Sequence, residues 1–250
     1  MKINSNKAKY FTFESITSTN DFAKELLLTE ELVVVTALHQ TKGRGRNVNQ
    51  WFGSYGNNLY LSIGIKHSSS VDLLTLAAMQ AVGSLGVRNT LQELTNKEIY
   101  KIKYPNDVYA YDGEKYRKIS GILVEHSFAG SECISSIIGI GVNVQEKSFP
   151  IDLRETAISL FQLGFNLDVK KVEENLVNSI FSLLANNSNK QIFDLWKKEL
   201  NLQNKQIKVL GKEANYRLSR FFLDGRLELV DEKNNKITID NGDSIRYDLN

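Results

Sequence analysis

Cysteine is almost missing from the sequence, since Cys133 is the only one in 250 residues. A single cysteine excludes an internal disulfide framework and any zinc site built from several thiolates. It also favours a reducing compartment, so we expect a cytoplasmic protein. Proline is nearly as scarce, with Pro105 and Pro150 alone, which excludes a proline-rich linker.

The sequence also lacks an excess of charge of one sign. Its 31 basic and 29 acidic side chains leave a formal net charge of +2, so the overall field gives no reason to expect nucleic acid or an anionic membrane as the main partner. No apolar run approaches the roughly 18–20 residues of a membrane span. The first ten residues are polar and lack the apolar core of a secretory signal. We therefore expect neither DNA nor a membrane as partner.

What the chain does have is the composition of an ordinary globular protein, with 42% hydrophobic and 24% charged residues. Alternating or continuous apolar runs predict strands at 10–16, 32–38, 59–65, 99–103, 107–111, 119–127 and 134–144. Helical spacing predicts helices after residue 20 and at 71–91, 169–186 and 190–199. The pattern indicates an α+β fold, with a mixed β-sheet flanked by helices.

The last fifty or so residues read differently. Short strand-like runs between 206 and 250 are broken by turn residues such as Gly211, Asp224-Gly225 and Asn241-Gly242. We expect a boundary near residue 201, with a catalytic domain at 1–200 and a small β domain at 201–250 that resembles a small barrel.

The most unusual segment is 40–46 (QTKGRGR), where glycines let the backbone approach a ligand beside several cations. This pattern predicts an anion clamp. It is not a dinucleotide fingerprint, because Val48 replaces the third glycine and a strand follows. It is not a P-loop either, because no Gly-Lys-Ser/Thr is present. A solvated basic turn or a nonspecific RNA contact would explain the same residues.

Further segments carry weaker signals. In 103–107 (KYPND) a proline stiffens a corner between strands, and Asp107 is suited to a hard cation, although Asn-Asp after proline is also ordinary turn chemistry. Lys118 enters an apolar strand that contains Gly121, where a lysine is usually just solvated. Gly139 and Gly141 interrupt an isoleucine-rich strand, which indicates either a flat ligand lying on the sheet or a bulge.

In this order and at these separations, the segments together with residues 18–20 (STN) resemble the catalytic core of the biotin–protein ligases. The resemblance runs from about Phe13 to Trp196 and more weakly to the end of the chain. It implies a mixed sheet like the class II aminoacyl-tRNA synthetase core, followed by an SH3-like domain. It also implies a two-step reaction, in which biotin and ATP form biotinyl-AMP with magnesium, and a lysine of a biotin carboxyl carrier protein then receives the biotinyl group.

The resemblance also implies roles for individual residues. Lys118 would be the main catalytic residue, assisted by Arg44 and Arg46. The biotin pocket would be formed by Ser18, Thr19, Asn20, Gln40, Gly43, Arg44, Lys118, Gly121, Ile122, Leu123 and Gly139. The ATP site would be formed by Arg46, Lys103, Asn106, Asp107, Lys118 and Asn143, and Asp107 would hold magnesium or orient its waters.

Two departures and several alternatives stay open. Residues 47–50 (NVNQ) lack the further basic and glycine residues common in the family, and Tyr104 stands where tryptophan is common. Only nine residues precede Tyr10, so we expect a form without the DNA-binding repressor domain; dimerisation through the sheet is a further expectation. The alternatives are a lipoate or octanoate ligase or transferase of the same fold, and a non-enzymatic RNA-binding protein.

Overall fold

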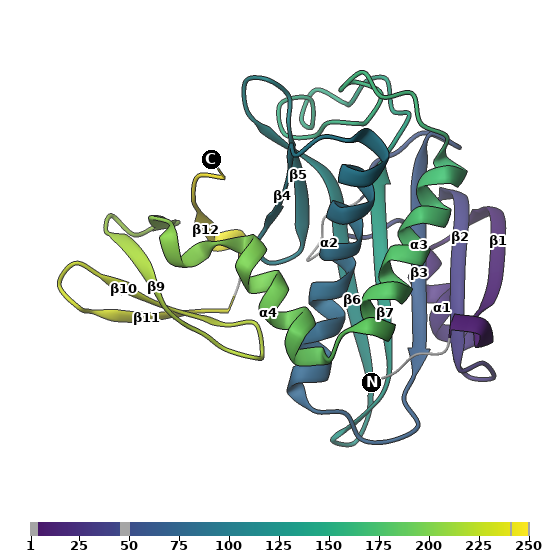
Figure 1. The fold of residues 1–250 in the computed structure, drawn as a ribbon, viewed down its shortest axis with the longest axis horizontal. Coiled ribbons are helices and arrows are strands. Elements are labelled where there is room, and N and C mark those ends of the chain that lie inside the picture. The colour runs from purple at the N-terminus through teal and green to yellow at the C-terminus, as the bar shows by residue number, and fades with distance from the viewer. Residues whose placement is uncertain (1–4, 46–50, 241, 250) are drawn as a thin grey trace.

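A computed structural model describes residues 5–45, 51–240 and 242–249. A seven-stranded mixed sheet with the strand order β1-β2-β3-β7-β6-β5-β4 forms the body of the molecule (Figure 1). Its strands are β1 (Lys9–Ile16), β2 (Leu32–Gln40), β3 (Asn58–Lys66), β4 (Tyr100–Lys103), β5 (Asp107–Tyr111), β6 (Tyr116–Ala129) and β7 (Glu132–Asn143). Only β1 and β2 pair in parallel; the other neighbours in this sheet are antiparallel. The predicted mixed sheet is confirmed.

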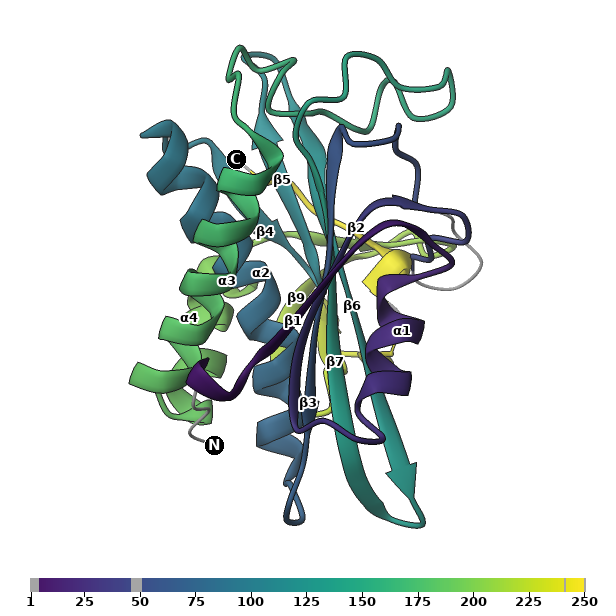
Figure 2. The same cartoon turned by 90° about the vertical axis from the view of Figure 1, so that its right-hand side faces the viewer.

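Helices cover both faces of this sheet (Figure 2). The helices are α1 (Thr19–Leu26), α2 (Leu73–Thr95), α3 (Val169–Asn186) and α4 (Asn189–Leu200). Helix α1 packs on one face and buries Ala23 and Leu27 with Val33 and Val35 of β2. Leu32 and Val34 point to the opposite face, into the larger core beneath α2, α3 and α4. Because both faces are covered, β2 reads as a continuous apolar run.

The ends of the helices follow their capping residues. Ser18 caps α1 and Asp72 caps α2 with side-chain oxygens, as expected for helix N-termini. Helix α2 ends at Thr95, and the left-handed φ of 51° at the capping residue Asn96 stops the helix. The helix predicted at 169–186 has these bounds in the structure. Strands β6 and β7 form a longer hairpin than predicted, because their ladder continues to Ala129 and Glu132.

A second, antiparallel sheet follows at the C-terminal end. It contains β8 (Ile207–Val209), β9 (Asn215–Phe221), β10 (Leu227–Asp231), β11 (Lys236–Ile239) and β12 (Ile245–Arg246) in the order β11-β10-β9-β8-β12. Its buried residues belong to the same hydrophobic cluster as Trp196 of α4, and the rings of Trp196 and Phe221 lie 5.4 Å apart. The two sheets thus share one core, and the division at residue 201 stays a prediction.

The C-terminal sheet is fastened to the end of β4. The backbone N–H of Tyr104 donates to the hydroxyl of Tyr247 at 2.6 Å. A Cβ on Gly242 would stand 2.5 Å from Cδ of Pro105, so only glycine fits at this contact. Residues from the end of the chain are therefore held beside the corner between β4 and β5.

No helix within the described part of the chain has both the length and the apolar character needed to span a membrane.

Candidate active site

The first turn of α1 presents a group of buried polar side chains. Ser18, Thr19 and Asn20 are each at most 5% exposed. The backbone N–H of Thr19 donates to Oε1 of Gln40 at 2.7 Å, and the Thr19 hydroxyl lies 3.0 Å from the same oxygen. This contact joins α1 to the end of β2, and it fixes the amide of Gln40 so that its Nε2 lies beside Gly43.

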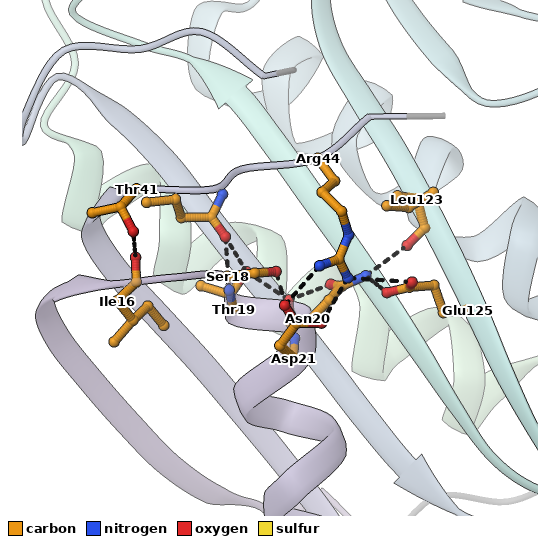
Figure 3. Close-up of polar contacts among 11 residues, drawn as sticks. Ile16, Ser18, Thr19, Asn20, Asp21, Thr41, Arg44, Leu123 and Glu125 are labelled. Atoms are coloured by element: carbon orange, nitrogen blue, oxygen red, sulfur yellow. Dashed lines mark hydrogen bonds and ion pairs between the residues drawn. The ribbon is translucent and has the colours of Figure 1, made fainter. Parts of the chain in front are cut away.

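Ser62 of β3 completes this group and was missed by the sequence analysis. It is fully buried, and its Oγ lies 2.7 Å from Oγ1 of Thr19 and 2.6 Å from Oδ1 of Asn20. Because an amide oxygen only accepts, the Ser62 hydroxyl must donate to Asn20. The Nδ2 of Asn20 then donates to Oε2 of Glu125 at 2.6 Å and to the Leu123 carbonyl at 3.4 Å (Figure 3). Both ends of the Asn20 amide are thereby fixed.

The glycines of β6 and β7 make room for side chains of this same chain. A Cβ on Gly139 would lie 2.2 Å from Oδ1 of Asn20, and Cβ atoms on Gly121 and Gly141 would lie 2.8 and 2.5 Å from the ring of Trp51. The flat group on the sheet is therefore the indole of Trp51. Gly139, which the resemblance assigns to the biotin ring, packs here against Asn20.

Arg44 extends over the first turn of α1. Its Nη1 and Nη2 donate to the two carboxylate oxygens of Asp21 at 2.6 and 2.7 Å, and Nη2 lies 3.4 Å from Oε1 of Glu125 (Figure 3). The hydrogen bond from Arg44 is the main reason that the pKa of Asp21 lies below its ordinary value. Arg46, the other predicted catalytic arginine, lies outside the described residues.

Lys118 of β6 lines both cavities of the site. Its Nζ lies 2.8 Å from Oδ1 of Asp107 and 5.5 Å from the centroid of the Trp51 ring. Lys103 lies on β4, which β5 separates from β6, and its Nζ donates to the hydroxyl of Tyr109 at 3.3 Å. Burial is the largest cause that lowers the pKa of Lys103, and it outweighs the attraction of Asp107.

Two cavities meet at Trp51. The smaller, of about 130 Å³, is lined on its polar side by residues 18–20, Gln40 and Arg44, and on its floor by residues 121–123 and Gly139. The larger, of about 860 Å³, is lined by Lys42, Lys103, Asn143, Asp243 and Arg246 among others. The residues common to both cavities are Gln40, Trp51, Asp107, Lys118 and Asp243.

The structure thus brings most of the predicted residues to one place. Gly43, Lys103 and Asn143 line the larger cavity. Asn106, expected on the ATP side, lines the smaller cavity, and its side-chain amide donates to the carbonyl of Ile122. The amide of Asn143 is occupied by the carbonyl of Ile158 at 3.0 Å.

The C-terminal sheet contributes residues that no local pattern assigned to the site. Asp243 lines both cavities and Arg246 lines the larger one.

Within the described residues no group of three or more His, Cys, Asp or Glu side chains could hold a metal ion. The arrangement suits a ligand with a small neutral head in the polar cavity and an anionic part between Lys118, Lys103 and Arg246.

Residues 12–143 match the model of the biotin/lipoate A/B protein ligase family. The bifunctional ligase/repressor BirA of Escherichia coli is 28% identical over 193 residues, which are 74% of this chain and 57% of that protein. The biotin–[acetyl-CoA-carboxylase] ligase of Mycobacterium tuberculosis is 30% identical over 136 residues, which are 53% of this chain and 46% of that protein. The chain thus spans about half the length of these curated relatives.

A solved structure shares the architecture. The biotin protein ligase of Aquifex aeolicus, solved in complex with biotin and ATP, superposes with a TM-score of 0.72 over 96% of this chain and 98% of that one, at 24% identity. At that identity the likeness shows the fold, which confirms the predicted fold class.

Proposed function

Since the chain belongs to the biotin/lipoate A/B protein ligase family, we propose that it attaches biotin to a lysine of a biotin carboxyl carrier protein, with ATP as the activating substrate. In the first step a carboxylate oxygen of biotin bonds to the α-phosphorus of ATP, and pyrophosphate leaves. In the second step the carrier lysine attacks the carbonyl of biotinyl-AMP, an amide bond forms, and AMP leaves. Each step requires positioned reactants and neutralised charge, and no nucleophilic side chain of the enzyme is required.

The observation that carries this proposal is the position of Lys118 at the junction of the two cavities. A carboxylate from the smaller cavity and an α-phosphate from the larger one would both reach its ammonium. As the new bond forms, negative charge gathers on the phosphoryl oxygens, and a fixed cation lowers the energy of that state. Lys118 would then exchange its contact with Asp107 for the reacting oxygens.

The neutral side of the smaller cavity supports biotin as the acid. The buried hydroxyls and amides of Ser18, Thr19, Asn20 and Gln40 offer both donors and acceptors. A urea group has one acceptor oxygen and two N–H donors, and it carries no charge. Such a head suits this polar wall, where the charged side chain of Arg44 is paired with Asp21 and Glu125. Lys118 would bind the carboxylate of the acid.

Magnesium would enter with ATP. Its oxygen-rich shell is usually completed by substrate phosphates and water, with one or two carboxylates from the protein. Asp107 and Asp243, which line both cavities, are the residues that would hold it, and the ion would offset charge on the phosphates. This donor set fits such a site and is too sparse for a cage made by protein ligands alone.

The proposal is tested with purified protein, biotin, magnesium and ATP. We expect pyrophosphate release that depends on biotin, and transfer of label to a carrier domain detected with avidin. Because the matched family includes lipoate ligases, lipoate and octanoate are supplied in parallel. Preference for either acid over biotin would replace the biotin assignment, and no acid-dependent pyrophosphate release would remove the ligase assignment.

A further inference from the structure

The charges around Arg44 are balanced in a way that its expected role does not explain. The resemblance assigns this arginine to the biotin carboxylate and the phosphates. In the structure its guanidinium faces two carboxylates, with a bidentate contact to Asp21 and a longer one to Glu125. A cation already paired with two anions has little net charge to offer to a phosphate. Lys118, by contrast, is paired with the single carboxylate of Asp107.

Both carboxylates are themselves held in place. Asp21 lies in the first turn of α1, and its N–H approaches the capping oxygen of Ser18 at 3.5 Å. Glu125 uses its second oxygen to accept the amide of Asn20 at 2.6 Å, and Asn20 is fixed in turn by Ser62. Arg44 is therefore connected to the same polar group that lines the smaller cavity (Figure 3).

The contacts of Arg44 continue a series that ties down the start of the glycine–arginine segment. The backbone N–H groups of Thr41 and Lys42 donate to the carbonyls of Ile16 and Thr17, each at 2.9 Å. The carbonyl of Gly43 accepts the N–H of Trp51 at 3.2 Å. Arg44 is the next residue, and its side chain fastens the segment to α1 and β6.

From this geometry we infer that Asp21 and Glu125 are positioning residues that act through Arg44. They hold residues 43–45 over the acid cavity, and Arg44 serves as a structural clamp for acid binding and not as a phosphate-binding cation. This inference rests on the proposed function, and it adds two residues to that site. A bidentate contact requires the planar fork of a guanidinium, which the single ammonium of lysine cannot replace.

The kinetic test compares Asp21→Asn, Glu125→Gln and Arg44→Lys. We expect each to raise the KM for biotin about two- to fivefold, as for a partly exposed ion pair, and to leave the KM for ATP unchanged. The KM for biotin of the double variant Asp21→Asn/Arg44→Lys should resemble that of either single variant, because both changes break the same bidentate contact between Asp21 and Arg44. Asp194→Asn removes the exposed carboxylate that pairs with Lys190 and Lys197 on α4 and is the matched control.

If Arg44 bound a phosphate instead, the Asp21→Asn and Arg44→Lys variants would change the KM for ATP in opposite directions. Removing the charge of Asp21 would then free the guanidinium, and the KM for ATP would fall in Asp21→Asn and rise in Arg44→Lys. That pair of results, or additive effects on biotin in the double variant, would overturn the clamp.

A second readout needs neither ligand nor activity. Trypsin must take the Arg44 side chain into its own pocket to cleave after it, so the contact with Asp21 protects this bond. We expect Asp21→Asn and Glu125→Gln to speed cleavage after Arg44 about threefold or more relative to cleavage after the exposed Lys42 in the same digest. Equal cleavage ratios in wild type and both variants would contradict the clamp. If the wild-type protein activates no acid, the proposed function fails, and the digest still decides whether the clamp exists.

Discussion

The two cavities that meet at Trp51 are built on different principles. The polar wall of the smaller one comes from the ends of regular elements, and its side chains hold one another before any ligand arrives. The larger one is lined by connecting segments near Leu153, by Arg246 of β12 and by Asp243 in the turn before that strand. A preorganised pocket loses little freedom on binding, and this favours selectivity for one small acid. The open side, with its charges, suits a nucleotide held largely through its phosphates.

Replacing Lys118 removes the group shared by both sides and should have the largest effect. We expect Lys118→Ala to slow biotin-dependent pyrophosphate release about 10²- to 10³-fold, the usual loss when one charge-stabilising contact is removed, with an unchanged fold by circular dichroism. Lys115→Ala, which breaks the exposed pair with Glu155, is the control. A wild-type rate in Lys118→Ala would remove this lysine from the mechanism.

Glu146 offers a way to damage the nucleotide side alone. This carboxylate is 4% exposed, and it accepts the backbone N–H and hydroxyl of Ser54 at 2.9 Å and the amide of Asn58 at 2.8 Å. It thereby anchors the segment whose residues Phe52 and Gly53 line the larger cavity and not the smaller one. Glu146→Gln puts an amide N–H against donors, so we expect a loss of about 1–3 kcal/mol in the free energy of unfolding and a raised KM for ATP with little change for biotin.

The control for Glu146 is Glu173→Gln, a buried glutamate on α3 that contacts Lys170. Chemical denaturation and initial rates measure both variants. An increase of the biotin KM in Glu146→Gln that equals the increase of the ATP KM would show that the two cavities are not independently supported.

Ser62→Ala should damage the acid side alone and by less. The change leaves Oδ1 of Asn20 without its donor, which costs about 1–3 kcal/mol when the group is buried, and part of this loss should appear as weaker biotin binding. We expect the KM for biotin to rise severalfold and that for ATP to stay constant. Ser84→Ala removes an equally buried hydroxyl that donates to its own helix at Ala81. If both serine variants weaken biotin binding equally, the contact with Asn20 is not responsible.

The smallest expected effect is a pH dependence of the free energy of unfolding, caused by two histidines that lie outside the lining of both cavities. His67 and His126 lie on either side of the buried hydroxyl of Ser136, each at 2.8 Å, and burial lowers the pKa of both imidazoles. As the pH falls below the ordinary value of 6.5, the unfolded chain takes up protons that the folded chain does not, so stability decreases. Well above that pH the two histidines do not change the free energy of unfolding as the pH varies.

Denaturant titrations between about pH 7.5 and about pH 5, where an unperturbed histidine titrates, measure how the free energy of unfolding changes with pH. His67→Gln should make this pH dependence shallower. An unchanged slope in that variant would show that the histidine pair does not control the pH response.

The sequence predicted the fold because its signals are local, whereas most of the cavity lining was implied by the resemblance to the biotin–protein ligases. Period-2 and period-3.6 patterns mark strands and helices, and glycines such as Gly139 and Gly141 stand out within an isoleucine-rich strand. Ser62 and Glu146 gave no such signal, since a buried polar residue in a strand or a loop has the same sequence neighbours as an exposed one. The partner that satisfies it lies on another element, and only the register of the sheet brings the two together.

The remaining contacts could not be predicted because they join residues that lie far apart in the sequence. Asp21 precedes β2 and Arg44 follows it, so their contact joins residues on either side of this strand. Asp243 lines the site beside Gly242, which packs closely on Pro105. The sequence analysis singled out Arg44 and the turn at Asn241-Gly242, but the sequence alone could not state which groups these residues face.

Trp51, which packs on Gly121 and Gly141 and lines both cavities, gives the protein a fluorescent reporter at the site. The chain has only two tryptophans, and the other, Trp196, is packed in the core at 2% exposure. A change in indole fluorescence when an acid or a nucleotide is added would therefore arise chiefly at the junction of the cavities. A Trp196→Phe protein would make that emission a single-site signal, and the order in which the two substrates bind could be followed without any attached dye.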